Sequence, residues 1–282
     1  MINKHKLKNL KLVVFDLDGT LLNSKGQIGS DTKNCVKELR KQGVKFSFAT
    51  KRLFSAVEQY ASELQLDVPI INLDGALIQK YPEKIIHYES YVKERHVLNA
   101  IDLADKFLLK LALCHSEAIY YTEYNQAMPY ILESYGAIFK EVDDYSRYTK
   151  KTLEVIIASD QKDAMKHVHS KLGFPFGFGL DVNFFKSHQR EAQYFIEIRR
   201  SGSSKGKGLV RLMKHLDIGV KDTAVICDWY NDVSLFETGA LKIAVANAVP
   251  EIKRMADYIT QRTNEEDGTA EFLELILRAK KG

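Results

Sequence analysis

The sequence has few cysteines, no long apolar run and no concentrated block of one charge. Its three cysteines, Cys35, Cys114 and Cys227, are odd in number and far apart, which excludes a disulfide framework and a zinc-binding spacing. No apolar run approaches the length of a membrane span. The net charge of +4 comes without a long basic block, which argues against nucleic acid as a partner. We therefore expect a cytoplasmic protein in a reducing compartment, with neither a membrane nor a nucleic acid as partner.

The first residues, MINKHKLKNLKLVVFDLDG, do not have the pattern of a secretory signal. A basic start is followed by apolar residues, but Asp16 and Asp18 interrupt the apolar stretch and no small-residue cleavage site follows. With 45% hydrophobic and 28% charged residues, the composition is that of an ordinary globular protein. A length of 282 residues allows one large domain or two ordinary ones.

Strands alternate with helices at both ends of the sequence. KLVVFDLD predicts a strand buried on both faces, and VKFSFAT and VPIINLDGALI (residues 68–78) predict two more. Between the first two, Ser30 or Asp31 can cap a helix that Gly43 ends. A similar alternation returns from Lys207 onward. Strands joined by single helices indicate βαβ units and a parallel sheet.

The middle of the chain has a different pattern, with shorter strands and mixed connections. Asp160 can cap a helix there, DQKDAMKHVHSKLG, and two strands are expected around 182–185 and 194–198. We therefore predict a core domain formed by residues 1–81 and 191–282, with a separate α/β domain inserted at 82–190. The sequence has no internal repeat and no low-complexity linker.

Polar groups gather where the expected core strands end. Asp16 and Asp18 follow the first strand, Thr50 the second, and Asp228, Asn231 and Asp232 a late one, while Lys205 begins a helix. Taken singly, each has a simpler explanation: a turn, a helix cap, a surface lysine or a loop of turn-forming residues. Open α/β sheets place their sites at this edge, so the group as a whole indicates one site.

The expected site brings carboxylates together, which requires a compensating charge. Two carboxylates about 4 Å apart repel by roughly 4 kcal/mol near a protein surface. A hard cation with oxygen ligands relieves this repulsion, and Mg²⁺ is the expected one because it combines one or two carboxylates with substrate phosphate. A threonine hydroxyl and a lysine ammonium suit a group rich in negative oxygen, such as phosphate.

Four segments resemble, in order and position, the motifs of the haloacid dehalogenase superfamily. They are FDLDGTL, FATKR, KGKGLVRL and CDWYNDVSLF. The later AVANAVPEIKRMADYIT and NEEDG resemble the tail of its Cof-like sugar-phosphatase branch, which inserts an α/β cap between the second and third motifs. The resemblance implies a Rossmann-like parallel-sheet core with an inserted α/β cap. It also implies a Mg²⁺-dependent phosphatase acting on a small phosphorylated metabolite, with a sugar phosphate as the leading substrate class.

The resemblance also implies a role for each matching residue. Asp16 is the expected nucleophile and forms an aspartyl-phosphate, and Asp18 is the expected general acid and base. Thr50 and Lys205 bind the transferring phosphoryl group, and Asn231 orients Lys205 or the phosphate. The expected metal site consists of Asp16, the backbone carbonyl of Asp18, Asp228 and Asp232, the last through the metal's waters.

Some positions leave alternatives open. Lys207 competes with Lys205 as the lysine of the third motif. Lys51 and Cys227 stand where the family usually has glycine, and Asp74 stands where it usually has asparagine, so substrate preference is in doubt. If the backbone at Lys51 needs a positive φ, its side chain costs about 1 kcal/mol.

Substrate contacts and the type of reaction are less determined. The run GFPFGFG can be a sugar-stacking loop or cap core, and His188, Gln189 and Arg190 can touch substrate. Two other functions compete with the phosphatase: a phosphomutase acting on sugar phosphates, and a non-catalytic phosphate-binding regulator. The specific substrate and the oligomeric state do not follow from the sequence.

Overall fold

The computed structural model describes residues 3–133, 136–173, 177–187 and 192–281. The chain forms two compact units. The core unit consists of Met1–Lys51, Val57–His87 and Ser204–Gly282, and the inserted unit of Arg52–Ala56 and Tyr88–Ser203. The domain ranges expected from the sequence, 1–81 with 191–282 and the insertion at 82–190, stay a prediction.

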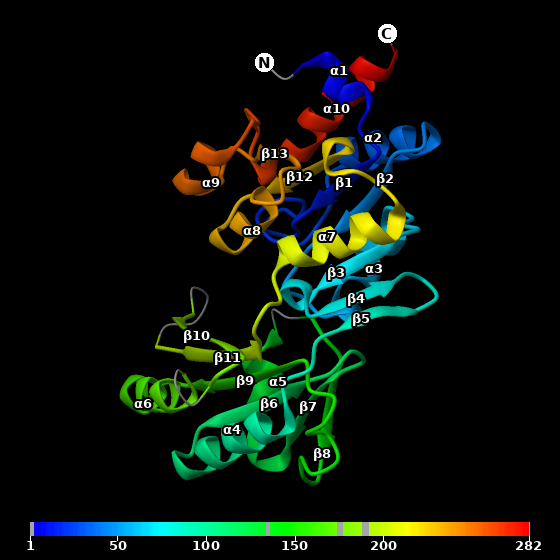
Figure 1. Ribbon diagram of the computed structural model, residues 1–282. Coiled ribbons are helices and arrows are strands. Elements are labelled where there is room, and N and C mark those ends of the chain that lie inside the picture. The colour runs from blue at the N-terminus through cyan, green and yellow to red at the C-terminus, as the bar shows by residue number, and fades with distance from the viewer. Residues whose placement is uncertain (1–2, 134–135, 174–176, 188–191, 282) are drawn as a thin grey trace. The chain divides into compact units, whose positions relative to one another are not determined.

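A parallel five-stranded sheet lies at the centre of the core unit (Figure 1), in the order β14-β13-β12-β1-β2. Its strands are β1 (Leu12–Phe15), β2 (Lys45–Phe48), β12 (Thr223–Cys227), β13 (Leu241–Ala244) and β14 (Tyr258–Ile259). β3 (Pro69–Asn72) extends the sheet through a parallel bridge between Ala49 and Ile71. The resulting order is that of a Rossmann-type sheet, whose direction of winding switches between β1 and β12.

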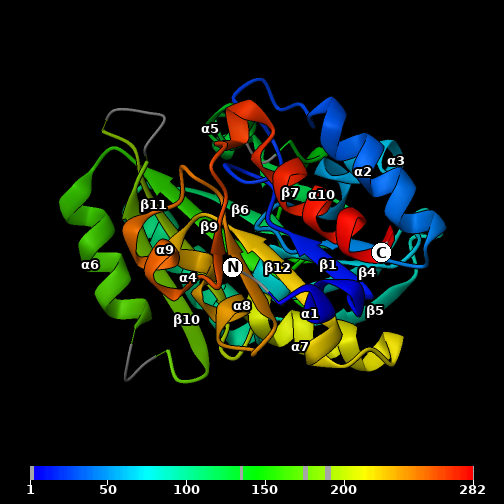
Figure 2. The same cartoon turned by 90° about the horizontal axis from the view of Figure 1, so that it is seen from above.

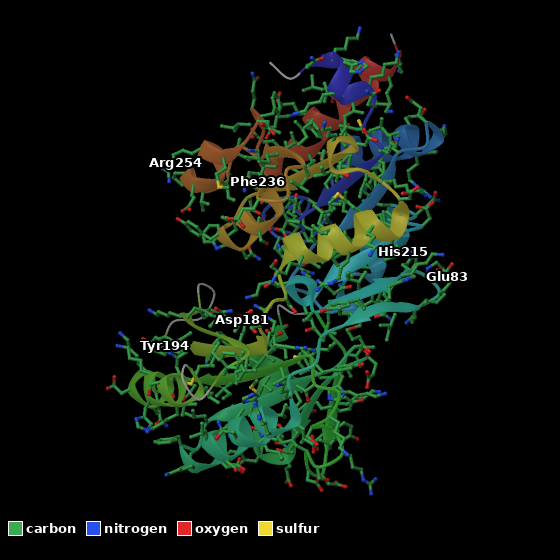
Figure 3. The ribbon with its side chains drawn as sticks, in the orientation of Figure 1. Glu83, Asp181, Tyr194, His215, Phe236 and Arg254 are labelled. Carbon is green, nitrogen blue, oxygen red and sulfur yellow. The ribbon has the colours of Figure 1, made fainter. Side chains whose placement is uncertain are left out.

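Helices cover both faces of this sheet, as the view from above shows (Figure 2). They are α1 (Lys4–Lys8), α2 (Ser30–Lys41), α3 (Glu58–Glu63), α7 (Lys205–Leu216), α8 (Val233–Phe236), α9 (Pro250–Met255) and α10 (Gly268–Lys281). α10 packs beside α2, and α7 packs on α8 and β3. Figure 3 shows the side chains of His215 on α7, Phe236 on α8 and Arg254 on α9. The predicted α/β class with a parallel-sheet core is confirmed.

The central strands are apolar on both faces because both faces are covered. Every residue of β1 and β12 is buried. Phe15 of β1 stacks on Phe46 of β2 with ring centroids 5.9 Å apart. This burial and packing place the ends of β1, β2 and β12 in the interior of the sheet, directly before the polar residues that follow them.

The segment 68–78, predicted to be a single strand, is a hairpin. β3 runs antiparallel to β4 (Leu77–Lys80), and β5 (Ile86–Glu89) completes a three-stranded sheet. Between β3 and β4, Leu73, Asp74 and Gly75 all have positive φ, and the Ala76 N–H donates to the Leu73 carbonyl. The continuous apolar pattern hid this turn, which the single Gly75 marks.

The cap of α2 does not come from its own residues. The N-cap position is Gly29, which makes no side-chain cap bond, so the predicted cap by Ser30 or Asp31 is wrong. The carboxylate of Asp267 instead accepts from the Asp31 and Thr32 N–H groups, at 3.0 Å each, and from the Thr32 hydroxyl at 2.5 Å. A residue more than 230 positions away thus satisfies two of the free N–H groups of this helix.

The cap predicted for Asp160 is also wrong. α6 (Lys162–Leu172) has Gln161 at its N-cap position, without a side-chain cap bond. The Gln161 N–H donates to the Ser159 hydroxyl, so the turn before the helix is held from the preceding strand instead.

The inserted unit contains a six-stranded sheet in the order β10-β11-β9-β6-β7-β8. Its strands are β6 (Lys110–Cys114), β7 (Ile119–Thr122), β8 (Phe139–Val142), β9 (Glu154–Ser159), β10 (Leu180–Lys186) and β11 (Tyr194–Arg200). Neighbouring strands are antiparallel except β7 and β8. α4 (Glu94–Lys106), α5 (Met128–Ile131) and α6 are its helices.

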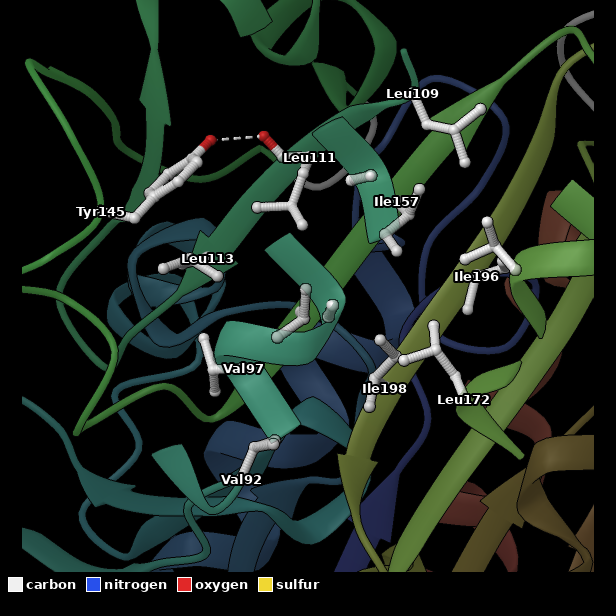
Figure 4. Packing of buried hydrophobic residues seen from close by; sticks show 14 of the residues in the cluster. Val92, Val97, Leu109, Leu111, Leu113, Tyr145, Ile157, Leu172, Ile196 and Ile198 are labelled. Carbon is white, nitrogen blue, oxygen red and sulfur yellow. Dashed lines mark hydrogen bonds between the residues drawn. The ribbon is translucent and has the colours of Figure 1, made fainter. Parts of the chain in front are cut away.

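The inserted unit has a hydrophobic core of its own between this sheet and α4 and α6 (Figure 4). Val97 of α4 and Leu172 of α6 join Ile157, Ile196 and Ile198 of the strands. At its border, the Tyr145 hydroxyl donates to the Leu111 carbonyl at 2.7 Å, so the one polar group of this ring is satisfied. Within the part of the chain that the structure describes, no helix combines the length and apolar character needed to cross a bilayer.

Candidate active site

The carboxyl ends of β1 and β12 place two aspartates side by side. Asp16 follows β1 directly and Asp228 follows β12 directly, and these neighbouring strands are in parallel register with Phe15 opposite Ile226. Thr50 lies two residues after β2, the strand on the other side of β1. This edge of the sheet is also where its winding direction switches, which is where open α/β sheets bind ligands.

Three carboxylates converge at this edge. Ligand oxygens of Asp16, Asp228 and Asp232 all lie within 4.8 Å of one another, and all three residues are buried. Octahedral Mg²⁺ with ligands at about 2.0–2.1 Å places ligand oxygens about 2.9–4.2 Å apart. The spacing and the all-oxygen donor set therefore fit a divalent cation of this kind.

Lys205 inserts its ammonium group between two of these carboxylates. Its Nζ donates to Asp16 Oδ1 at 2.6 Å and to Asp232 Oδ1 at 2.7 Å, and the residue is only 1% exposed. Burial by itself lowers the pKa of an ammonium group, but Asp16 and Asp232 outweigh it and raise the pKa of Lys205 well above its usual value. The lysine is therefore a permanent positive charge against Asp16.

A single lysine does not balance the acids. Burial raises the pKa of Asp16 well above its usual range, the charge of Asp232 adds to this, and Lys205 opposes it. Burial also raises the pKa of Asp228 to about 6, although the Thr20 hydroxyl opposes the shift. Without a further cation, this cluster favours carboxyl groups that keep a proton.

The turn after β12 is held by Asp232, from η6 (Tyr230–Asp232). While its Oδ1 meets Lys205, its Oδ2 accepts from the backbone N–H groups of Asp228 and Trp229, at 3.3 and 3.2 Å. The same carboxylate thus orients Lys205 and fixes the backbone that carries Asp228. Asn231 lies beside it in η6 and is half-buried.

The helix that delivers Lys205 begins with closely packed backbone. Ser204 caps α7 by accepting from the Lys207 N–H. A Cβ at Gly206 would lie 1.9 Å from the Ser234 carbonyl oxygen, so only glycine lets α7 approach the segment after η6 this closely. This accounts for glycine at position 206. The structure also separates the two candidate lysines, because Lys205 points into the cluster whereas Lys207 is exposed.

Two residues of this region were missed by the sequence analysis. The Thr20 hydroxyl donates to Asp228 Oδ1 at 2.6 Å, and the Ser234 hydroxyl accepts from the Gly206 N–H at 3.1 Å. The sequence contains a signal for Thr20, because this residue follows Asp18-Gly19 in the first motif. Ser234 had no comparable signal.

The remaining predicted residues either follow β1 and β2 or lie outside the described residues. Asp18 is exposed on the turn after β1, two residues beyond Asp16. Thr50 is fully buried, its N–H donating to the Ile71 carbonyl and its carbonyl accepting from the Asp74 N–H. The aromatic run is only partly described, since residues 174–176 lie outside the described residues, as do His188, Gln189 and Arg190.

The structure describes all three positions at which the sequence departs from the family pattern. Lys51 is not among the described residues with positive φ, so the strain considered for it does not arise. Cys227 is a fully buried thiol at the end of β12, and burial raises its pKa well above the usual value. Asp74 lies close enough for its negative charge to raise the pKa of Lys205, so it contributes to the field of the site.

Most of the chain is similar to known proteins. Residues 13–273 match the family of haloacid dehalogenase-like hydrolases. Phosphatase YwpJ of Bacillus subtilis is 27% identical, over 95% of this chain and 100% of the relative. The 5-amino-6-(5-phospho-D-ribitylamino)uracil phosphatase YwtE of the same organism is 24% identical, over 95% and 98%. A solved haloacid dehalogenase-like hydrolase from Bacteroides thetaiotaomicron is 27% identical with a TM-score of 0.83, covering 95% of this chain and 99% of that one.

Proposed function

The chain belongs to the haloacid dehalogenase-like hydrolase family, and from this membership we propose that it is a Mg²⁺-dependent phosphatase of small phosphorylated metabolites. The observation that carries the proposal is the contact between Asp16 and buried Lys205 within the carboxylate cluster. A buried carboxylate held by the ammonium group of Lys205, at the edge where open α/β sheets bind their ligands, suits covalent catalysis on a phosphate ester.

In the first half of the reaction, a carboxylate oxygen of Asp16 attacks phosphorus. A bond forms between that oxygen and phosphorus while the bond from phosphorus to the ester oxygen breaks. Asp18 gives its proton to the leaving alcohol as this bond breaks. The exposure of Asp18 suits this role because its carboxyl group can reach a substrate that enters from solvent.

In the second half, water hydrolyses the aspartyl-phosphate. Asp18, now a carboxylate, takes a proton from the water molecule while the oxygen of that water bonds to phosphorus. The bond between phosphorus and Asp16 breaks, so inorganic phosphate leaves and the Asp16 carboxylate is restored. Lys205 and the Thr50 hydroxyl neutralise and hold the phosphoryl oxygens in both steps, and Asn231 orients the phosphate.

The cation has a defined place in this scheme. Asp16, the backbone carbonyl of Asp18 and Asp228 would hold Mg²⁺, with Asp232 close enough to support its waters. When bound, Mg²⁺ supplies positive charge against the phosphoryl oxygens and offsets the repulsion between the acids.

For the substrate, we infer a phosphorylated sugar or sugar alcohol. The relative YwtE is named for a substrate with its phosphate on a ribityl chain. Lys205 and Thr50 suit the phosphate common to this class, and the rest of the substrate sets the specificity.

The test is phosphate release from a panel of sugar phosphates, sugar-alcohol phosphates and nucleotides, with Mg²⁺ and with EDTA. Wild type is compared with Asp16→Asn and with Asp102→Asn, an exposed aspartate of α4. We expect Mg²⁺-dependent release that is lost in Asp16→Asn and kept in Asp102→Asn. Full activity of Asp16→Asn would contradict the mechanism.

The rival functions give different results in the same experiment. A phosphomutase would release little phosphate and would isomerise sugar phosphates only with a bisphosphorylated sugar present. A non-catalytic binder would turn over nothing, but inorganic phosphate with Mg²⁺ would still alter the fluorescence of Trp229. This residue follows Asp228 directly and is the one tryptophan of the sequence.

A further inference from the structure

The tail segments AVANAVP and NEEDG contact the turn that follows Asp16. Asn247, in the connection from β13 to α9, donates from Nδ2 to the Gly19 carbonyl at 2.7 Å. Asn264, before α10, donates from Nδ2 to the Leu22 carbonyl at 2.9 Å. The two side chains therefore hold both ends of the segment 19–22, from positions more than 200 residues away.

The two asparagines also hold each other. The Asn264 N–H donates to Asn247 Oδ1 at 2.9 Å. Because this oxygen accepts a backbone N–H, the other end of the Asn247 amide must be the nitrogen, which can only donate. The Asn247 side chain thus accepts from the Asn264 backbone with its oxygen and donates to the Gly19 carbonyl with its nitrogen.

The peptide held in this way lies against the carboxylate cluster. Gly19 has φ +82°, and a Cβ there would lie 2.4 Å from Asp228 Oδ2. The next residue, Thr20, donates to the other oxygen of Asp228. Glycine fits this close approach, but it also has the greatest backbone freedom of any residue. Contacts from outside the turn therefore restrict the 18–20 backbone further, in addition to the hydrogen bonds within the turn.

We propose that Asn247 and Asn264 are positioning residues that hold the Asp18-Gly19-Thr20 backbone in the geometry needed for phosphoryl transfer. This inference rests on the proposed function, because it assigns the turn its catalytic importance. Rotation of the peptides at Gly19 would move the Asp18 side chain and its backbone carbonyl, and would shift Thr20 from Asp228. Asn247 itself is exposed and buries little surface, so its contribution to overall stability is small.

Asn247→Asp is the sharpest variant for testing this role. Aspartate has nearly the same shape and still accepts from the Asn264 N–H, but as a carboxylate it cannot donate to the Gly19 carbonyl. We expect kcat to fall at least tenfold while KM changes less than about threefold and the thermal midpoint moves little. Asn247→Ala should behave similarly, and Asn34→Ala, at an exposed asparagine of α2, should match wild type. Wild-type kcat in Asn247→Asp, or a lowered midpoint with unchanged kcat, would overturn the proposal.

A second measurement does not depend on activity. The N–H groups of Thr20, Leu21 and Leu22 all donate to the Leu17 carbonyl in this turn. Hydrogen–deuterium exchange of a peptide covering 17–24 should be faster in Asn247→Asp than in wild type, with exchange in β1 unchanged. Unchanged exchange of 17–24 would refute the positioning role, whatever reaction the protein catalyses. If wild type released no phosphate but exchange accelerated, the proposed function would fail and the structural link would stand.

Discussion

At the scale of single residues, the most demanding feature of the core unit is a buried lysine between two buried carboxylates. Desolvating Lys205, Asp16 and Asp232 is costly, and their mutual attraction offsets that cost only in the close geometry observed. Buried ion pairs of this kind often add little to the stability of a protein. The permanent positive charge of Lys205 beside Asp16 instead suits a site that binds an anion.

Lys205→Met should therefore destabilise the protein as well as inactivate it. Removing the ammonium leaves Asp16 and Asp232 as uncompensated buried acids, with an expected cost of about 3–5 kcal/mol. Urea unfolding measures this cost in the absence of Mg²⁺. The control is Lys207→Met, two residues along on the exposed side of α7, which should change stability by less than about 0.5 kcal/mol. Equal stability of the two variants would contradict the role of Lys205 as charge partner.

The variant Asp18→Asn should distinguish the role of Asp18 from that of Asp16, the other carboxylate of the first motif. Loss of a general acid slows the reaction by about 10²–10⁴-fold when the leaving group needs a proton. An alkyl phosphate should therefore lose far more activity than 4-nitrophenyl phosphate, whose phenolate leaves without one. The values of kcat/KM on both substrates measure the difference, because kcat/KM reports the steps up to release of the leaving group and leaves out the second step, in which Asp18 is the expected base. Equal losses of kcat/KM would argue against Asp18 as the acid.

At the scale of elements, the beginning of α2 depends on the end of the chain. Gly29 lies so close to Asp267 that a Cβ there would be 2.0 Å from its carboxyl carbon, and that carboxylate replaces the missing side-chain cap of the helix. The negative charge also suits the positive end of the helix dipole. α2 and α10 are thereby joined at their N-terminal ends by hydrogen bonds as well as by packing.

Asp267→Ala should lower the free energy of unfolding by about 1–2 kcal/mol, the usual cost of a lost helix cap. Chemical denaturation checks this, with Asp67→Ala at an exposed aspartate before β3 as the control. Gly29→Ala should be destabilising too, because its methyl group would displace the same carboxylate. Unlike Asn247→Asp, Asp267→Ala should leave kcat within about threefold of wild type, and a large loss of kcat would link this cap to the active site.

At the scale of the whole molecule, stability should depend on pH and Mg²⁺ together. The raised pKa of Asp228, about 6 against an unfolded value near 4, means that the metal-free folded state binds more protons than the unfolded state between these values. This group therefore lowers the free energy of unfolding as pH rises from about 4 through 6. A cation that replaces the proton should remove this loss.

We accordingly expect Mg²⁺ to raise the thermal midpoint more at pH 7.5 than at pH 5. At a concentration about 100 times its Kd, a ligand of the folded state adds about 2.7 kcal/mol. Scanning calorimetry with Mg²⁺ and with EDTA at both pH values measures the effect, and Asp228→Asn should reduce it. A rise of the same size at both pH values would mean that Asp228 is not a metal ligand.

Local patterns in the sequence determined much of the architecture. Apolar runs that end in polar residues mark β1, β2 and β12. Because parallel strands end at one edge of a sheet, this pattern by itself predicts that Asp16 lies near Asp228. The alternation of strands and helices was enough to predict the α/β class. The interruption of that alternation was enough to predict a different segment in the middle of the chain. These features are encoded within a few neighbouring residues, so a single sequence reveals them.

Features that depend on partners far away in the sequence became visible only in the folded protein. The turn that divides residues 68–78, the cap that Asp267 supplies to α2, and the links from Asn247 and Asn264 to the turn after β1 are of this kind. The position of Lys205 between two carboxylates, with Lys207 exposed, is another. Hydrogen bonds and ion pairs between residues far apart in sequence follow from how elements pack, and residue type and local spacing contain no record of that packing.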